Sequence, residues 1–177
     1  NHAYFNLNGQ GNPTITDHEL TIFASQFSAV DTTLIPAVAP VSVKGTPFDF
    51  TSAKLIGKEI DADHIQIKNG KGYDHNFVLD KKTPKELVKA AVVFAPSTGI
   101  QMEVFTTEPA IQFYSGNFLN GSLVGKKGKN YPYRSAFCLE TQHYPDSPNQ
   151  PAFPSTQLAP GETYQTSTIY KFGVKNN

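Results

Sequence analysis

Short apolar or alternating runs, separated by turns rich in Gly and Pro, set the pattern of this chain. Residues 87–95 are almost continuously apolar, and residues 100–107 alternate Ile, Met and Val with Gln, Glu and Phe. The intervening residues 96–99, Pro-Ser-Thr-Gly, are typical of a turn, so the two runs predict a β-hairpin. Further strands are expected at residues 20–25, 110–114, 136–141 and 163–172.

Helical periodicity is nearly absent, and turn residues come too often for long helices. The chain has 13 glycines and 13 prolines among 177 residues, and one short helix is predicted at residues 52–60. With 38% hydrophobic residues, the chain can bury one core of ordinary domain size. The pattern therefore predicts an all-β fold, arranged as an antiparallel β-sandwich.

The start of the chain is unusual, because residues 1–7 already have the composition of a strand. No leader comes before this strand-like stretch, and the first residue is Asn1 instead of Met. We therefore expect the chain to be a truncated or cleaved product whose native amino terminus, with any signal segment, has been left out.

Composition removes several classes of function. Lys and Arg together number 15, as do Asp and Glu, so the formal net charge is zero and a nucleic-acid partner is not expected. No apolar run approaches the roughly 18 residues of a membrane-spanning helix, so no membrane partner is expected either. Cys138 is the single cysteine, which rules out an intrachain disulfide. A cytoplasmic location is expected on this basis, with the periplasm and secretion left open.

The histidines do not group with cysteine at the spacing of zinc ligands, so neither a metal nor another cofactor is expected. His75 and His143 are expected to be structural. His18 and His64 lie in loop-like surroundings and are expected to be solvated. Cys138 lies in an apolar strand and is expected to be a buried, inert thiol.

Four polar residues stand out because they lie within aromatic or apolar segments: His2, Asp74, Gln112 and Glu140. Each has an ordinary structural explanation when taken alone, as a core histidine, a turn residue or an outward-facing strand residue. Together they combine aromatic rings with planar polar groups. Rings pack on the apolar faces of a sugar while amides and carboxylates bind its hydroxyls, so the combination indicates a carbohydrate site.

At the level of motifs, the chain resembles the galactose mutarotase (aldose 1-epimerase) family. Four segments resemble that family's signature stretches in the same order: NHAYFNLNG at 1–9, YDHNF at 73–77, IQFYSGN at 111–117 and FCLETQ at 137–142. The resemblance covers essentially the whole chain. It implies a large antiparallel β-sandwich, the supersandwich of that family, about twice as long as this chain.

On this resemblance, residues 1–177 are the C-terminal part of a single sandwich domain whose N-terminal part is missing from the chain. In the family, that N-terminal part supplies an arginine and a further histidine to the same cleft. Neither residue can be pointed to here. An N-terminal fragment of the same protein is therefore an expected partner.

The resemblance also implies a reaction, the interconversion of the α and β anomers of an aldohexose. Glu140 would be the base that takes the proton of the anomeric hydroxyl, and His2 the acid that protonates the ring oxygen. Asp74 and Gln112 would bind sugar hydroxyls, and Phe113 or Tyr114 would form an aromatic wall. The substrate is a monosaccharide such as galactose or glucose, and no metal or cofactor is required.

Two alternatives remain open from the sequence. The first is a carbohydrate-binding module without catalysis, although such a module has no need of the acid and base pair of His2 and Glu140. The second is a fragment that is inactive without its N-terminal part. A phosphorylated hexose ranks low as substrate because Arg134 is the only arginine in the chain.

Overall fold

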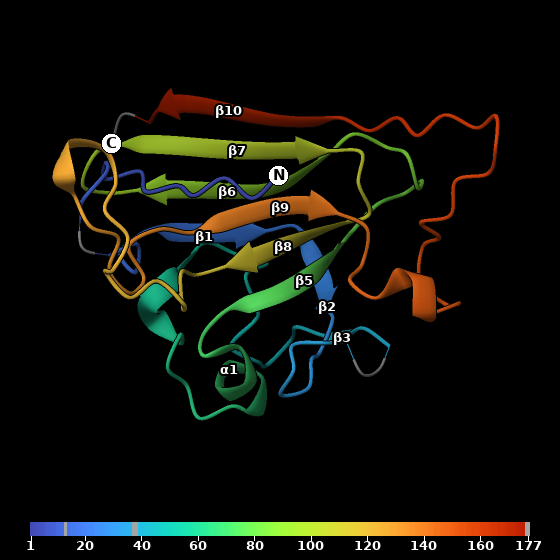
Figure 1. The fold of residues 1–177 in the computed structure, drawn as a ribbon, viewed down its shortest axis with the longest axis horizontal. Coiled ribbons are helices and arrows are strands. Elements are labelled where there is room, and N and C mark those ends of the chain that lie inside the picture. The colour runs from blue at the N-terminus through green and yellow to red at the C-terminus, as the bar shows by residue number, and fades with distance from the viewer. Residues whose placement is uncertain (13, 37–38, 176–177) are drawn as a thin grey trace.

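Two five-stranded antiparallel sheets form the framework of the computed structural model, which describes residues 1–12, 14–36 and 39–175 (Figure 1). The first sheet has the order β10-β7-β6-β1-β4 and the second the order β3-β2-β5-β8-β9. The strands of the first sheet are β10 (Thr168–Val174), β7 (Ile100–Thr106), β6 (Val88–Ala95), β1 (Glu19–Ile22) and β4 (Lys54–Leu55). Those of the second are β3 (Val41–Ser42), β2 (Ala24–Phe27), β5 (Asp74–Leu79), β8 (Ala110–Tyr114) and β9 (Cys138–Gln142). The prediction of an all-β antiparallel sandwich is confirmed.

The predicted hairpin is present as β6 and β7, which pair in antiparallel register from Val88 with Thr106 to Ala95 with Ile100. The turn closes through a hydrogen bond from the Gly99 N–H to the Ala95 carbonyl, at 2.9 Å. Gly99 has φ +71, a conformation that costs a glycine little. Along β7, Met102 and Val104 are buried, as the alternating pattern predicts.

The strand predicted at residues 20–25 is divided between the two sheets. β1 ends at Ile22 and β2 begins at Ala24, so Phe23 is the crossover residue. The Phe23 N–H donates to the carbonyl of Ala90 in β6, and its carbonyl accepts from the N–H of Asp80 after β5. One residue thus links the two sheets.

The helix predicted at residues 52–60 is wrong. Those residues contain β4 and a short 3₁₀ turn, η1 (Ile56–Lys58), because Leu55 pairs with Glu19 of β1. Among the residues described, the one α-helix is α1 (Ile65–Gly70). His64 caps its start by accepting the N–H of Gln66 at its Nδ1, so this histidine is half-buried, not solvated as predicted.

The first seven residues do not form the strand that their composition predicts. Within them, Phe5 makes an isolated β-bridge with Phe137, just before β9. Two hydrogen bonds form this bridge, from the Phe5 N–H to the Phe137 carbonyl at 2.8 Å and back at 2.9 Å. The segment therefore lies along the second sheet and is held there by this bridge.

The core lies between the two sheets and is rich in aromatic rings. Buried side chains from β1, β6 and β7 meet others from β5, β8 and β9 in one continuous cluster. Phe27 and Phe48 stack with their ring centroids 4.3 Å apart, and Tyr73 stacks on Phe113 at 5.3 Å. Close packing of this kind holds the strands in register. It therefore fixes which side chains lie next to one another on the outer face of each sheet.

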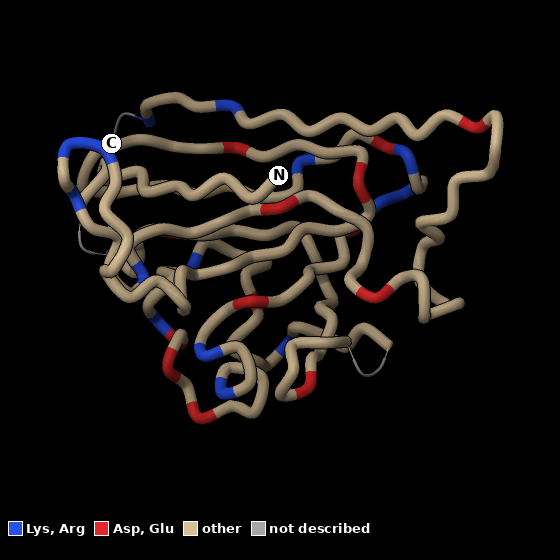
Figure 2. The backbone as a smooth tube through the Cα atoms, in the orientation of Figure 1, with Lys and Arg blue, Asp and Glu red and all other residues tan. Residues whose placement is uncertain are grey.

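Positions of both charge signs are spread around the loops and edges of the molecule (Figure 2). Within the described ranges, neither the α-helix nor any 3₁₀ turn is long and apolar enough to cross a membrane.

Candidate active site

Strands β5, β8 and β9 lie side by side and carry the polar residues that the sequence singles out. Gln112 is the register partner of both Asn76 and Glu140, and Tyr114 is the partner of both Asp74 and Cys138. Since alternate residues of a strand share a face, these side chains form one surface of the sheet. The residues between them, His75, Phe113 and Leu139, are buried on the other face.

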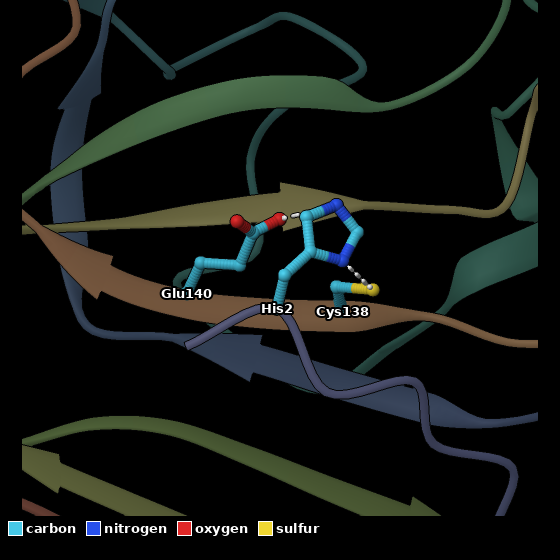
Figure 3. Close-up of side chains that lie close together, drawn as sticks. All are labelled: His2, Cys138 and Glu140. Atoms are coloured by element: carbon cyan, nitrogen blue, oxygen red, sulfur yellow. Dashed lines mark hydrogen bonds and ion pairs between the residues drawn. The ribbon is translucent and has the colours of Figure 1, made fainter.

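His2 reaches this surface from the N-terminal segment. Its Nε2 lies 3.5 Å from Oε1 of Glu140, and its Nδ1 lies 3.3 Å from Sγ of Cys138 (Figure 3). The His2 side chain is 52% exposed and that of Glu140 is 16% exposed, so the pair is open to solvent mainly on the histidine side. The bridge between Phe5 and Phe137, three residues further along, holds the segment in this place.

Two tyrosines surround the His2 ring. The ring centroids of His2 and Tyr4 are 4.9 Å apart, and those of His2 and Tyr114 are 5.9 Å apart. The Tyr114 hydroxyl accepts the N–H of Phe118 at 2.9 Å, and the two rings stack at 6.1 Å. Of the two residues expected to form an aromatic wall, Tyr114 lies at this surface, whereas Phe113 is fully buried in the core.

The other predicted pair, Asp74 and Gln112, is joined directly. Gln112 Nε2 donates a hydrogen bond to Asp74 Oδ1 at 2.8 Å, and Gln142 Nε2 lies 3.5 Å from Gln112 Oε1. The amides and carboxylate therefore form a connected polar row. The structure brings all four predicted site residues to one face of the second sheet.

Burial controls the protonation of both carboxyl groups. Burial raises the pKa of Asp74, while the Gln112 hydrogen bond and the charge of His2 act in the opposite direction. Burial also raises the pKa of Glu140, opposed by His2 and reinforced by the nearby Asp74 carboxylate. A raised pKa makes a carboxylate a stronger base, which suits a group that has to remove a proton.

Three possible metal ligands of different kinds lie close together, and one of them is the predicted acid, His2. In the part of the chain that the structure describes, His2, Cys138 and Glu140 form a group that could hold one metal ion. Their nitrogen, sulfur and oxygen ligand atoms all lie within 4.8 Å of one another. Cys138 is fully buried, as predicted, and burial raises the pKa of its thiol.

The remaining histidines lie outside this surface. His18 is fully buried, with its Nε2 accepting the Leu7 N–H at 3.0 Å and its Nδ1 2.9 Å from Asp17 Oδ1, so the prediction that it is solvated is wrong. It anchors the N-terminal segment that carries His2, a role for which the sequence gives no signal. His75 is buried, and His143 lies 2.8 Å from Glu108 Oε2.

A β-sandwich with carboxylates, amides and a histidine set among aromatic rings on one sheet face has the features of a carbohydrate-active protein. The sequence profile of the family described as Aldose 1-epimerase matches residues 1–171. The chain belongs to the aldose 1-epimerase family.

The chain is similar to several members of that family. It is 49% identical to galactose mutarotase of Rattus norvegicus over 174 residues, which cover 98% of this chain and 49% of that protein. It is 44% identical to aldose 1-epimerase of Escherichia coli (strain K12), covering 97% of this chain and 49% of that protein. The crystal structure of an aldose epimerase homologue from C. elegans is similar with a TM-score of 0.84 and 34% identity, over 99% of this chain and 50% of that one. The chain spans about half the length of the relatives it matches.

Proposed function

We propose that this chain carries the acid and base of an aldose 1-epimerase, which interconverts the α and β anomers of a hexose such as galactose or glucose. The observation that carries the proposal is the 3.5 Å approach of His2 Nε2 to Glu140 Oε1. In a sugar ring the anomeric hydroxyl and the ring oxygen are bonded to the same carbon. An acid and a base that serve these two oxygens therefore have to lie close together, as this pair does.

The proposed reaction consists of two proton transfers and one bond cleavage. Glu140 takes the proton of the anomeric hydroxyl, the bond between C1 and the ring oxygen breaks, and His2 protonates the ring oxygen. The product is the open-chain aldehyde. Rotation about C1–C2 presents the other face of the aldehyde, and the reverse transfers close the ring. Each positioned acid or base contributes roughly 10²–10⁴-fold to the rate.

Asp74 and Gln112 are proposed to bind the sugar hydroxyls. Their mutual hydrogen bond at 2.8 Å orients both groups before the sugar arrives, which lowers the entropic cost of binding. Tyr4, half exposed beside His2, offers a ring face on which the apolar face of a pyranose can pack, and the buried Tyr114 supports the His2 ring from the sheet.

The relatives are about twice as long as this chain, and we propose that full activity needs the portion that this chain lacks. On this proposal the residues described here form part of one larger sandwich domain. The remaining polypeptide of the same protein is the partner that completes the cleft, and the cytoplasm is the location.

The first prediction tests Glu140. The Glu140→Gln variant keeps the size and hydrogen-bonding capacity of the side chain but removes the base. We expect kcat to fall by at least about 10²-fold while sugar binding stays detectable. Polarimetry of freshly dissolved α-galactose measures the rate, and titration with galactose followed by tyrosine fluorescence measures binding.

The matched control is Glu103→Gln on β7, where the carboxylate pairs with Lys89 and Lys171, away from the site face. It should retain the parental rate. Both variants are measured in the chain alone and together with the complementary half of a galactose mutarotase. If Glu140→Gln keeps more than about a tenth of the parental kcat, Glu140 is not the base; binding without any turnover in the parent supports a carbohydrate-binding module instead.

A further inference from the structure

The side chains of His2, Cys138 and Glu140 lie close enough together to bind a metal ion as well as to transfer protons. We propose that His2, Cys138 and Glu140 form a reversible binding site for a thiophilic divalent cation such as Zn²⁺, and that the bound ion excludes sugar from the site. Nitrogen, sulfur and carboxylate oxygen are the three ligand types that zinc prefers in proteins. Their ligand atoms all lie within 4.8 Å of one another.

The strand geometry explains why these ligands converge. Cys138 and Glu140 are two residues apart on β9, so the pleat of the strand points both side chains to the same face. His2 comes from a separate segment and lies against both, with its two ring nitrogens 3.3 Å from the sulfur and 3.5 Å from the carboxylate (Figure 3). Each ligand therefore already has a second ligand as its neighbour.

The spacing fits a single ion after a small adjustment. Ligands at the usual Zn–N, Zn–O and Zn–S distances of about 2.0–2.3 Å lie roughly 3–4 Å from one another around a tetrahedral ion. The sulfur and Nδ1 already meet this spacing at 3.3 Å. The carboxylate lies 3.5 Å from the other ring nitrogen, Nε2, so binding one ion requires it to move toward the Nδ1 side. The half-exposed His2 ring can turn, because its segment is anchored further along, at Phe5 and Leu7.

The site is suited to reversible occupancy. It offers three protein ligands where a structural zinc site has four, and the His2 side chain is 52% exposed. Binding converts one thiol and one M²⁺ into one metal thiolate and one proton. The open fourth position and the exposed ligand separate this site from a permanent structural one.

An ion in this place occupies the groups that the proposed reaction needs. It takes a lone pair of Glu140 and holds the His2 ring as a ligand, so the two side chains can no longer act together as base and acid on a sugar. This inhibitory part of the inference rests on the proposed function. The binding part does not, because it depends only on the three ligands.

The binding test uses Cd²⁺ as probe, since a cadmium–thiolate bond absorbs in the near ultraviolet. Titration of the reduced protein should give a saturable charge-transfer band at one ion per chain. The band should disappear in Cys138→Ser. In His2→Gln the affinity should fall by at least about tenfold, because the loss of even an outer-shell partner costs 10–100-fold.

Two features keep the test decisive. His2 is half exposed, so His2→Gln remains informative even if replacement of the buried Cys138 impairs folding. His143→Gln is the matched control, since His143 contacts Glu108 and is not one of the three ligands. The absence of a saturable band, or an unchanged affinity in His2→Gln, would overturn the proposed site.

The inhibitory part has its own readout. Zn²⁺ should raise the apparent KM for galactose and leave kcat unchanged, and galactose should weaken Cd²⁺ binding by the same competition. Noncompetitive inhibition, or no effect of sugar on the cadmium band, would overturn exclusion. If the chain gives the cadmium band but shows no epimerase activity, the proposed metal site stands and the proposed function is wrong.

Discussion

His75 shows how a single side chain depends on its protonation state. Its Nδ1 accepts the N–H of Asp74 at 3.1 Å, and its Nε2 lies 3.2 Å from Gln66 Oε1. Both contacts are satisfied only by the neutral ring with its proton on Nε2. Burial accordingly lowers the pKa of His75 to about 3. The residue beside the proposed sugar-binding aspartate is thus a neutral structural group.

The pKa of His75 predicts loss of stability in mild acid. In the unfolded chain a histidine binds a proton at about pH 6.5, whereas His75 in the folded chain does so only near pH 3. Between these values the unfolded state holds more protons, so His75 lowers the free energy of unfolding by up to about 1.4 kcal/mol for each pH unit of acidification. The free energy of unfolding can be measured by urea denaturation at several pH values in this window. It should fall less steeply with acidification for His75→Gln than for the parent.

The half-buried His143 again offers the control, because it pairs with Glu108 and neither residue belongs to the hydrophobic core cluster. His143→Gln should not reproduce the shallower slope. Equal slopes for His75→Gln and the parent would mean that His75 is protonated in the folded chain at mildly acidic pH.

Among the elements, the turn between α1 and β5 positions Asp74. Lys71 and Gly72 both have positive φ, at +55 and +130, and they turn the chain from the helix into the strand. Asn117 fastens this turn from the end of β8, since its Nδ2 donates to the carbonyls of Gly70 and Tyr73, each at 2.9 Å. A Cβ on Gly72 would lie 2.4 Å from the Asn117 side-chain oxygen.

Gly72→Ala should therefore destabilise the chain and weaken sugar binding together. The strained backbone costs about 1–3 kcal/mol, and the clash with Asn117 adds to it. Gly45→Ala is the control, because Gly45 has φ +74 but nothing lies within 4 Å of its added Cβ. Urea midpoints and galactose affinity should both fall further for Gly72→Ala than for Gly45→Ala. Equal losses in the two variants would show that backbone strain alone is responsible.

Elements with local causes could be predicted from the sequence. The β6–β7 hairpin and β8 follow from alternation and turn residues within the segments themselves. The helix predicted at residues 52–60 fails because β4 is selected by pairing with β1, far away in the chain. The buried place of His18 likewise depends on the N–H of Leu7, a contact that no local pattern encodes.

The sequence indicates which residues belong to the candidate site, but not how they are arranged in space. Embedded polar residues and the family resemblance select His2, Asp74, Gln112 and Glu140. The cross-strand register that places Gln112 opposite Glu140 is a property of the folded sheet. The contact between His2 and Cys138 joins residues 136 positions apart, so it emerges only in the structure.

The molecule as a whole presents an apolar edge at β10. This strand is the last in its sheet, and Phe172 and Val174 on it are 52% and 72% exposed. A cavity of about 760 Å³, lined in part by Phe5, Leu7 and Phe172, lies beside it. An exposed sheet edge with apolar side chains favours pairing with further polypeptide.

The whole-molecule prediction concerns that edge. A separately produced polypeptide corresponding to the uncovered half of a galactose mutarotase should bind this chain and raise its epimerase rate. Sedimentation measures the complex and polarimetry measures the rate. Phe172→Lys should weaken the complex, whereas Ile65→Lys, at the start of α1 and on the opposite side of the molecule, should not (Figure 1). Failure of the two polypeptides to associate would contradict the proposed partner.

The alternation along β5, β8 and β9 has a consequence for how this family diversifies. Because core side chains and site side chains take turns along the same strands, a substitution at Gln112 or Asn76 changes the site face without repacking Phe77 or Phe113 on the other. On the proposed function, the sugar-facing surface can therefore change one position at a time while the core stays the same.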